Sequence, residues 1–246
     1  MKNKIIIVAA GTGSRLGPLT KTTPKPLVEY EKGKTILGEA LEQINASEVI
    51  HEVTLVVGYL ASQIEGWIDA NKDKYKNLKI STVYNPYYED SGNLHSLWFA
   101  EGLISGNCFI TNADNIIHRD VFVLMAKETS SCLAVCENDN LREDDMKAYV
   151  EGDEVVDVNK DIQQKDGILE SVSLVRVVNQ DTESFVQVLN GCIRNEIHKL
   201  DYWPIIFNKL YKSGTYVKPV KIDKDAWHEI DYHGDIIDLI QKQGKK

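Results

Sequence analysis

The sequence predicts an α/β fold, a Rossmann-like arrangement in which a mixed, mostly parallel central sheet lies between two layers of helices (three-layer α/β/α). Three observations support this prediction. Short apolar runs that suit buried strands alternate with segments of helical apolar spacing through the first 115 residues. A glycine-rich segment directly follows the first apolar run. After Asp114 this alternation gives way to shorter strands separated by turn residues, which makes the predicted sheet mixed.

Strands and helices alternate in the first half. Ile5–Val8 is a run of β-branched residues, which is typical of a buried parallel strand. Further strands are predicted at Val53–Val57, Leu78–Val83 and Cys108–Thr111. The apolar spacing between these strands predicts helices at Thr35–Ile44, Ile64–Ala70 and Leu94–Leu103. This order implies a parallel sheet with helices on both of its faces.

The second half is predicted to be partly antiparallel. Strands are expected at Cys132–Cys136, Lys147–Val150, Glu154–Val158 and Leu169–Val178, with a turn at Glu151-Gly152-Asp153. Helices are expected around Ser184–Arg194 and Trp203–Lys212, then strands at Tyr216–Ile222 and Trp227–Ile230 and a helix at Gly234–Gln241. No composition break, repeat or low-complexity linker divides the chain, so we expect one domain over residues 1–246.

Composition limits the expected partners and location. The chain has 28 basic and 37 acidic side chains and a formal charge of −9, which argues against nucleic acid or an anionic membrane as a partner. The acidic stretch at residues 137–166 is expected to be a solvated face. The apolar run Ile5–Ala10 is too short for a signal peptide, and no run suits a membrane span. We expect a cytoplasmic protein, either a monomer or a homodimer.

The cysteines indicate neither disulfides nor zinc. There are four, too scattered for a disulfide framework: Cys108, Cys132, Cys136 and Cys192. Cys132 and Cys136 form a C-x3-C pair with no second pair, which is not a zinc-site pattern. We expect reduced thiols, mostly in strands.

Glycines directly after a buried strand let the backbone approach a ligand and point amide groups at phosphates. A P-loop is excluded because no Lys-Ser/Thr pair follows the glycines. Gly11, Gly13 and Gly17 are spaced G-x-G-x3-G, which is not the spacing of a dinucleotide-binding loop. The glycine loop alone therefore leaves its ligand undecided.

The neighbouring residues are more specific. The segment Ala9-Ala10-Gly11-Thr12-Gly13-Ser14-Arg15-Leu16, followed by Thr23-Pro24-Lys25-Pro26-Leu27, closely resembles the signature of the nucleotidyltransferase family that includes sugar-1-phosphate and choline-phosphate nucleotidyltransferases. The resemblance implies that residues 9–14 bind a nucleoside triphosphate and that Arg15 and Lys25 contact phosphates as the catalytic cations. Such cations are needed because an anionic phosphate must approach a triphosphate.

The resemblance also implies a Mg²⁺ site. Asn112-Ala113-Asp114-Asn115 follows a predicted strand where the family places a magnesium-binding aspartate, Asp114 here. Glu229-Ile230-Asp231 resembles the family's E-I-D motif, whose aspartate is the second metal ligand. Each aspartate could instead cap a helix, near Arg119 or at the start of the last helix.

A third motif indicates the nucleotide. Tyr84-Asn85-Pro86-Tyr87-Tyr88 and Asn93-Leu94-His95-Ser96-Leu97 resemble the choline-phosphate and phosphonate cytidylyltransferase branch, whereas the E-K-P motif of sugar-specific members is not found. Contacts to base and ribose are predicted for Gly58, Tyr59, Asn85, Ser91, Asn93 and Ser96. The alternatives are helix capping by Ser91 or Asn93 and a simple turn at Gly58.

The acceptor site is predicted from aromatic residues. Asp201-Tyr202-Trp203 resembles the aromatic pair that choline-phosphate enzymes place around a quaternary ammonium, and Tyr149 and Trp227 could join it. Lys160 stands where relatives often keep a lysine for the substrate phosphate. Alternatively, Tyr202 and Trp203 belong to a helix packed in the core. The strand Val172–Val175 lacks the aromatic residue of the choline pattern, which makes choline itself doubtful.

These features together predict a Mg²⁺-dependent nucleotidyltransferase. It would transfer CMP from CTP to a small phosphorylated alcohol or phosphonate, phosphocholine-like, and release pyrophosphate; residues 1–115 would bind the nucleotide and 116–246 the acceptor. One alternative is a sugar-1-phosphate nucleotidyltransferase using UTP or dTTP. The other is a nucleotide-sensing module that has lost the chemistry, against which the intact Arg15, Lys25, Asp114 and Asp231 argue.

Overall fold

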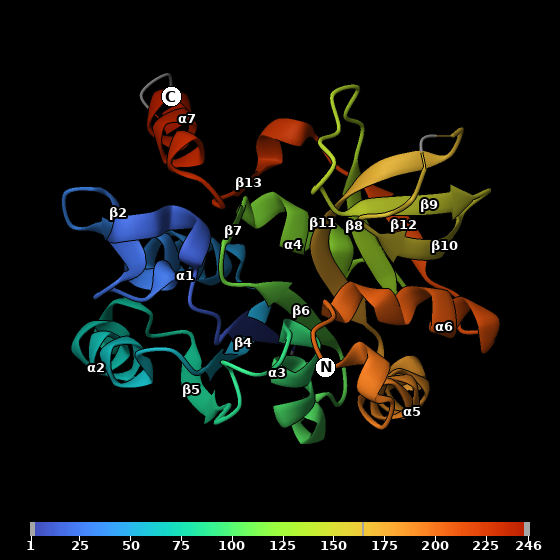
Figure 1. The fold of residues 1–246 in the computed structure, drawn as a ribbon, viewed down its shortest axis with the longest axis horizontal. Helices are drawn as coiled ribbons and strands as arrows, with labels where there is room; N and C mark the ends of the chain where they lie inside the picture. Colours follow the sequence, from blue (N-terminus) through green and yellow to red (C-terminus); the bar gives the residue numbers. More distant parts are fainter. Residues whose placement is uncertain (1–2, 164, 244–246) are drawn as a thin grey trace.

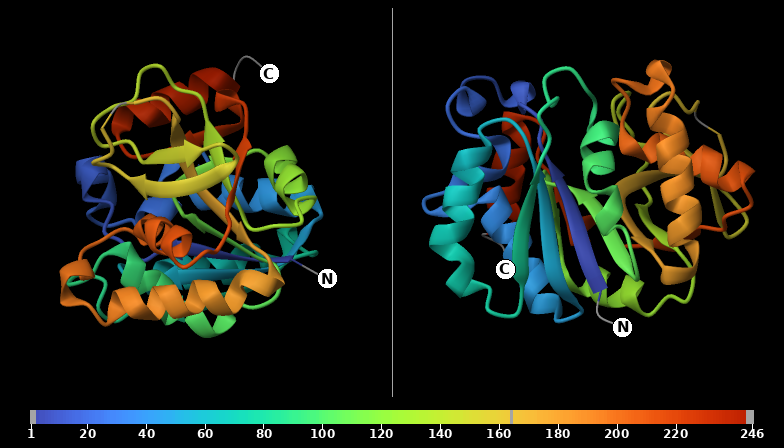
Figure 2. Two further views of the ribbon diagram at one scale, coloured as in Figure 1. Left: turned by 90° about the vertical axis from the view of Figure 1, so that its right-hand side faces the viewer. Right: turned by 90° about the horizontal axis from the view of Figure 1, so that it is seen from below.

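The computed structural model describes residues 3–163 and 165–243, and its main sheet is mixed. The four strands predicted in the first half are present and parallel: β1 (Asn3–Ala9), β4 (Ile50–Val57), β5 (Lys79–Tyr84) and β6 (Cys108–Asn112). Strand β1 lies between β4 and β6, as the right-hand view of Figure 2 shows. The residue ranges predicted from apolar runs agree with these strands to within about three residues at either end.

The second half extends the same sheet with strands of both directions. They are β8 (Cys132–Cys136), β9 (Lys147–Glu151), β10 (Glu154–Asn159), β11 (Ile168–Val177) and β12 (Lys218–Lys221). Strand β11 pairs with β6, β8 and β9, and always antiparallel, whereas β12 runs parallel to β8. Only β10 and β11 therefore run against the other described strands of this sheet, which confirms the predicted mixed, mostly parallel arrangement.

Helices cover both faces of the sheet (Figure 1). One layer contains α1 (Ile36–Ser47), α2 (Ala61–Asn71) and α4 (Arg119–Ala126), and the other α3 (Asn93–Phe99), α5 (Thr182–Ile193) and α6 (Ile206–Lys212). Ile5 and Ile7 pack with the first layer, and Ile6 and Val8 with the second. Because successive side chains of β1 are buried on opposite faces, the whole strand is apolar.

Two small sheets lie outside the main one. The first pairs β2 (Glu29–Glu31) with β3 (Lys34–Thr35), and the second pairs β7 (Asn115–Ile117) with β13 (Trp227–Glu229). The last helix, α7 (His233–Gln243), packs against β2. Of these elements only β13 and α7 were predicted, because strands of two or three residues are too short for a periodic pattern.

Some predicted elements have different boundaries in the structure. The helix predicted at Leu94–Leu103 ends at Phe99 and continues only as a 3-10 turn at Glu101–Leu103, which contains a glycine. The helix predicted at Trp203–Lys212 begins with a 3-10 turn, Trp203–Ile205, that contains Pro204. Proline is tolerated there because the N–H groups of a first helical turn have no partner within the helix. Helix α4 was not predicted, although Val121, Phe122 and Met125 have helical spacing.

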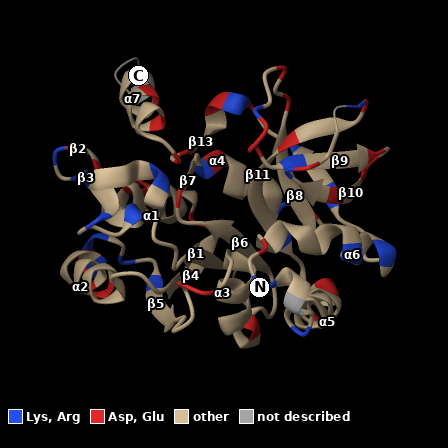
Figure 3. Cartoon of the chain, in the orientation of Figure 1, with Lys and Arg blue, Asp and Glu red and all other residues tan. Residues whose placement is uncertain are grey.

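The cysteines and charges are distributed as follows. All four cysteines are buried and unpaired, and burial raises the pKa of Cys108, Cys132 and Cys136 to about 12. Charged residues lie mainly on helices and loops, whereas the central strands β1, β4 and β6 are largely uncharged (Figure 3). None of the described helices combines the length and apolar character that a membrane crossing requires.

Candidate active site

A cavity of about 330 Å³ lies at the carboxyl ends of β1 and β6. The glycine loop forms one wall, and Gly13 there adopts a left-handed conformation with φ of 64°. A Cβ atom added to Gly13 would lie 2.7 Å from the Cβ atom of Lys25, so only glycine fits without displacing the lysine. The cavity is lined by Val8, Ala9, Gly11, Thr12, Gly13, Ser14, Arg15, Lys25, Pro26, Asn93, Asn112, Ala113, Asp114, Tyr202 and Asp231.

Lys25 connects the two predicted metal ligands. Its Nζ atom lies 2.9 Å from Asp114 Oδ2 and 2.8 Å from Asp231 Oδ1. All three side chains are largely buried, with 13, 21 and 14 per cent of the side chain exposed for Lys25, Asp114 and Asp231. A lysine and two aspartates from three distant parts of the sequence therefore form one cluster at the cavity.

The pairing of β7 with β13 brings the two aspartates together. Glu229 pairs with Asn115, and the Ile230 N–H donates to the Asp114 carbonyl oxygen at 3.0 Å. Asp114 directly precedes β7, and Asp231 follows β13 after one residue. Backbone hydrogen bonds of this short sheet thus fix the separation of the two carboxylates.

Arg15 extends the cluster toward the opening of the cavity. Its Nη1 atom lies 2.9 Å from Asp231 Oδ2, and its guanidinium also contacts the Tyr202 hydroxyl. Its side chain is 40 per cent exposed, so it remains accessible to a ligand. Partial burial would lower the pKa of Arg15, but the nearby Asp231 charge and the Tyr202 and Tyr232 hydroxyls raise it, which keeps the guanidinium charged.

The charges in the cluster determine the ionisation of its carboxyl groups. Burial would raise the pKa of Asp231, but the positive charges of Lys25 and Arg15 outweigh it and hold that pKa below its usual value. Glu229 lies beside the cluster, where burial and the charges of Asp114 and Asp231 raise its pKa to about 8. The cluster therefore favours the ionised form of Asp231, and it disfavours ionisation of the neighbouring Glu229.

The two aspartates have the chemistry of a Mg²⁺ site. Asp114 Oδ1 is buried and has no hydrogen-bond partner among the described residues, so it retains free lone pairs. Carboxylate oxygens are hard ligands, and magnesium commonly combines one or two of them with substrate phosphates. Within residues 3–163 and 165–243, no group of three or more His, Cys, Asp or Glu residues is placed to hold a metal. An ion here would thus share the two aspartates with phosphate oxygens.

The predicted nucleotide-binding residues fall into two groups. Those that line the cavity are Ala9, Gly11, Thr12, Gly13, Ser14 and Asn93. Those outside the lining are Ala10, Gly58, Tyr59, Asn85, Ser91 and Ser96. Tyr59 supports the loop, since its backbone N–H donates to the Ala10 carbonyl oxygen and its hydroxyl to the Thr20 carbonyl oxygen.

The Asn85 motif also has an internal structural role. Asn85 is fully buried, and its Nδ2 atom donates to Ser96 Oγ at 3.0 Å. The Asn85 Oδ1 atom accepts from the Tyr87 backbone N–H, and Ser91 Oγ donates to the Tyr87 carbonyl oxygen. These contacts hold the turn between β5 and α3, and so they position Asn93 at the cavity.

The predicted aromatic wall is not assembled. Tyr202 lines the cavity and is 40 per cent exposed, but Trp203 is fully buried in the core, which corrects its predicted role as a wall residue. Tyr149 lies outside the lining and contacts Glu151 and Lys165. Trp227 lines a different cavity, of about 420 Å³, together with Glu170 and Glu229.

Lys160 lies beside the one aromatic ring that remains. Its Nζ atom is 4.4 Å from the centroid of the Tyr202 ring, and it makes no hydrogen bond or ion pair with the described residues. Its backbone carbonyl accepts from the buried Lys147 at 2.7 Å. The Lys160 ammonium group therefore lies over the Tyr202 ring, which was predicted to contact the acceptor.

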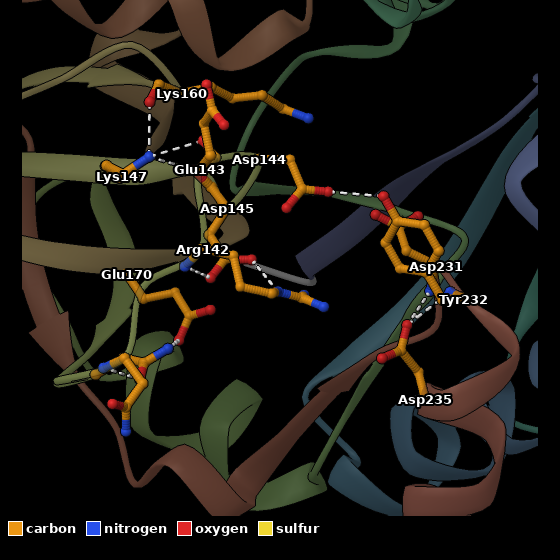
Figure 4. A network of polar contacts seen from close by, with 12 residues as sticks. Arg142, Glu143, Asp144, Asp145, Lys147, Lys160, Glu170, Asp231, Tyr232 and Asp235 are labelled. Atoms are coloured by element: carbon orange, nitrogen blue, oxygen red, sulfur yellow. Dashed lines mark hydrogen bonds and ion pairs between the residues drawn. The ribbon is translucent and has the colours of Figure 1, made fainter.

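A polar network connects this region to Asp231 (Figure 4). The Tyr232 hydroxyl donates to Asp144 at 2.9 Å, and Asp235 accepts from the backbone N–H groups of Asp231 and Tyr232. Asp145 lies in the stretch predicted to be a solvated face, but it is buried, and two hydrogen bonds from Arg142 satisfy its carboxylate. The network fixes the segment that carries Asp231.

Asn112 lines the cavity but was not predicted as a site residue. Its Oδ1 atom accepts from Trp203 Nε1 at 2.8 Å. The only signal in the sequence was its place in the segment Asn112-Ala113-Asp114-Asn115, two residues before the predicted metal ligand.

Comparisons with known proteins show the family of the chain and its fold. The family model described as Nucleotidyl transferase matches residues 4–151. A choline-phosphate cytidylyltransferase from Streptococcus pneumoniae is 34% identical over 119 residues, which are 48% of this chain and 48% of that protein. A 2-aminoethylphosphonate cytidylyltransferase from Lancefieldella rimae is 32% identical over 132 residues, 53% of this chain and 50% of that protein. The chain thus spans about half the length of the curated relatives it matches.

A solved structure extends the likeness to the whole fold. The structure of a CTP:phosphocholine cytidylyltransferase from Streptococcus pneumoniae superposes with a TM-score of 0.78, at 23% identity, over 100% of both chains. At that identity the likeness concerns the fold alone, and it includes the second half, which lies largely beyond the family match.

Proposed function

Since the chain belongs to the nucleotidyl transferase family, we propose that it transfers CMP from CTP to a small phosphorylated alcohol or a phosphonate and releases pyrophosphate. The observation that carries this proposal is the position of Lys25 between Asp114 and Asp231, beside the glycine loop and Arg15. The choice of CTP is supported by the relatives named above, which are cytidylyltransferases of phosphorylated or phosphonate compounds.

The reaction needs no nucleophile from the protein. An oxygen of the acceptor's phosphate or phosphonate attacks the α-phosphorus of CTP and forms a new P–O bond. The bond between the α-phosphorus and the oxygen that bridges it to the β-phosphate breaks. The bonding electrons leave with pyrophosphate, so the oxygens of the leaving group gain negative charge. Lys25 and Arg15 stabilise this charge and reduce the repulsion between the two anionic reactants.

Asp114 and Asp231 would hold Mg²⁺ at this site. When bound, the ion supplies further neutralisation of phosphate charge. The two aspartates also bind Lys25, and they place its ammonium group in the cavity where phosphates are expected. Lys25 is thereby positioned before substrate binds, which avoids an ordering cost during the reaction.

The acceptor would bind on the side of Tyr202, which lines the cavity. Lys160 is not among the lining residues, but its ammonium group lies over the Tyr202 ring and suits an anionic phosphate or phosphonate. The aromatic contacts predicted for a quaternary ammonium head group reduce to Tyr202 alone. We therefore propose a phosphorylated alcohol or phosphonate as the acceptor class and leave choline as one member of that class.

The test is a substrate panel with detection of pyrophosphate. The protein would be incubated with CTP, UTP or dTTP and with phosphocholine, 2-aminoethylphosphonate, glycerol phosphate or glucose 1-phosphate, with and without Mg²⁺ and a chelator. We expect metal-dependent pyrophosphate release that is fastest with CTP and a non-sugar acceptor. Preference for UTP or dTTP with glucose 1-phosphate would indicate the sugar-nucleotide alternative, and no release with any pair would indicate a module that only binds nucleotides.

A further inference from the structure

Trp203 contacts two amide side chains that line the cavity. Its indole Nε1 donates to Asn112 Oδ1 at 2.8 Å, and its backbone N–H donates to Asn93 Oδ1 at 2.8 Å. The two amides also lie next to each other, with 3.5 Å between Asn93 Nδ2 and Asn112 Oδ1. Trp203 is fully buried, so it sits behind the cavity wall and holds both amides from the core.

These contacts fix the orientation of the Asn112 amide. An indole N–H only donates, so turning the Asn112 amide over would place an NH₂ group against the N–H of Trp203. The Asn112 oxygen must therefore face Trp203, and the Nδ2 group takes the opposite position. Among the described residues, Asn112 Nδ2 has no hydrogen-bond partner. The cavity wall thus presents an uncharged N–H donor in a fixed orientation.

The position of this donor indicates its ligand. Arg15 and Lys25 supply the charged groups of the cavity, and they suit phosphate oxygens. Asn112 and Asn93 are neutral, and they reach the same lining from the end of β6 and the start of α3. A neutral amide donor suits an uncharged oxygen, and the uncharged oxygens that a nucleotide brings into such a site are mainly its ribose hydroxyls.

We propose that Asn112 is a nucleotide-binding residue that donates its amide N–H to a ribose hydroxyl, and that Trp203 is the positioning residue that orients this amide. The inference rests on the proposed nucleotidyl transfer and deepens it. A site built to hydrogen-bond a hydroxyl discriminates against the analogue that lacks it, because the buried donor is then left unpaired. Asn112 therefore makes the enzyme selective for ribonucleotides.

The first experiment compares kcat/KM for CTP, 2′-deoxy-CTP and 3′-deoxy-CTP in the parent enzyme and in Asn112→Ala. The parent should prefer CTP over one of the deoxynucleotides by about tenfold, as for the loss of one buried hydrogen bond. Asn112→Ala should reduce that preference to about twofold or less. The ratio does not depend on the fraction of folded enzyme, so a destabilised variant remains informative. An unchanged preference in Asn112→Ala, or a parent that uses all three nucleotides equally, overturns the proposal.

The second experiment tests Trp203 against a matched tryptophan. Trp98 Nε1 donates to Asn190 Oδ1 at 2.9 Å, and neither residue lines the cavity. Trp203→Phe and Trp98→Phe each remove one indole–amide hydrogen bond, so both should lower Tm, and Trp203→Phe should lower it more because Trp203 is fully buried. Only Trp203→Phe should lower the preference for CTP over the deoxynucleotide. If Trp203→Phe keeps the parent's preference, Trp203 is a packing residue and its positioning role is wrong.

The parent enzyme separates this inference from the proposed function. If the parent releases pyrophosphate with UTP instead of CTP, the same ratios are measured with UTP and its deoxy analogues, and the role of Asn112 is tested independently of the base. If the parent releases none with any nucleotide, the proposed function is wrong, and calorimetric titration of CTP and its deoxy analogues then tests the Asn112 contact as binding alone.

Discussion

The two halves of the molecule differ in how their candidate site residues reach the cavity. In the first half the residues that follow β1 and β6 line the cavity, among them Gly11, Lys25 and Asp114, whereas residues after β4 and β5, such as Gly58 and Asn85, do not. In the second half only Tyr202 and Asp231 line it, whereas Trp203 is in the core and Tyr149 lies outside the lining.

The difference follows from the two kinds of sheet. Parallel strands end at the same edge, so the residues that follow β1 and β6 must come close together whatever their side chains are. The strands of the second half run in both directions, and their loops emerge at both ends of the sheet. There the position of an aromatic residue depends on how it packs, and a local motif does not specify this.

The sharpest test of the contrast is Trp203→Ala. Because the ring is fully buried, its removal should lower the free energy of unfolding by about 3–5 kcal/mol. Denaturant unfolding measures the loss, and the KM for the acceptor is measured on the same variant. Tyr202→Phe is the control, since its ring is 40 per cent exposed and should tolerate the change. An unchanged unfolding free energy together with a raised acceptor KM would show that Trp203 contacts the acceptor and is not a core residue.

The second prediction concerns the first half. Asp114→Asn removes one carboxylate of the pair that binds Lys25 and would hold Mg²⁺, so kcat should fall by about 100-fold or more. Because Asp114 is largely buried and paired with Lys25, stability should fall as well, so kcat is measured on the folded enzyme. Asp69→Asn, in an exposed ion pair with Lys72, is the control and should leave kcat unchanged. Full activity of Asp114→Asn would contradict the metal assignment.

The third prediction separates binding from chemistry at Lys25. Its ammonium group is expected to act on charge that develops in the transition state, so Lys25→Ala should lower kcat by at least about tenfold and weaken CTP binding less than that. Single-turnover rates and calorimetric titration with CTP measure the two quantities. Reduced CTP affinity with unchanged turnover at saturation would instead show that Lys25 only binds the nucleotide.

The sequence predicted most of the fold because both faces of the parallel strands are buried. Ile5–Val8 could be recognised as a strand from its composition alone. It predicted Asp114 and Asp231 as a pair only through family resemblance. Their proximity depends on β7, which has three residues and no periodic pattern, and on its pairing with β13. Such a contact between distant segments leaves no local signal.

Asn85 and Asn112 illustrate a second reason. Both are asparagines near the end of a strand, and the resemblance favoured Asn85 as the ligand contact. In the structure Asn85 is fully buried and bonded to Ser96, whereas Asn112 lines the cavity. The side-chain amide can serve a turn or a ligand equally well, and only the surrounding packing decides which.

The smallest predicted effect concerns acceptor choice in the second half. Lys160 lies 4.4 Å from the Tyr202 ring, and a cation over an aromatic face contributes about 0.5–1 kcal/mol at an exposed site. Lys160→Ala would uncover this face and remove a cation near the acceptor phosphate. We expect kcat/KM to fall for both phosphocholine and glycerol phosphate, and the preference for phosphocholine to rise about two- to fivefold, which corresponds to that energy.

The chain provides a matched control for this change. The Lys165 Nζ atom lies 3.2 Å from the centroid of the Tyr149 ring, and Tyr149, unlike Tyr202, does not line the cavity. Lys165→Ala should therefore leave the ratio of the two acceptors unchanged. If Lys160→Ala lowers the use of both acceptors by the same factor, Lys160 does not compete for the Tyr202 face. A strong preference of the parent for phosphocholine would then mean that Tyr202 alone holds the quaternary ammonium. The cationic acceptor predicted from the Asp201-Tyr202-Trp203 motif would in that case be supported.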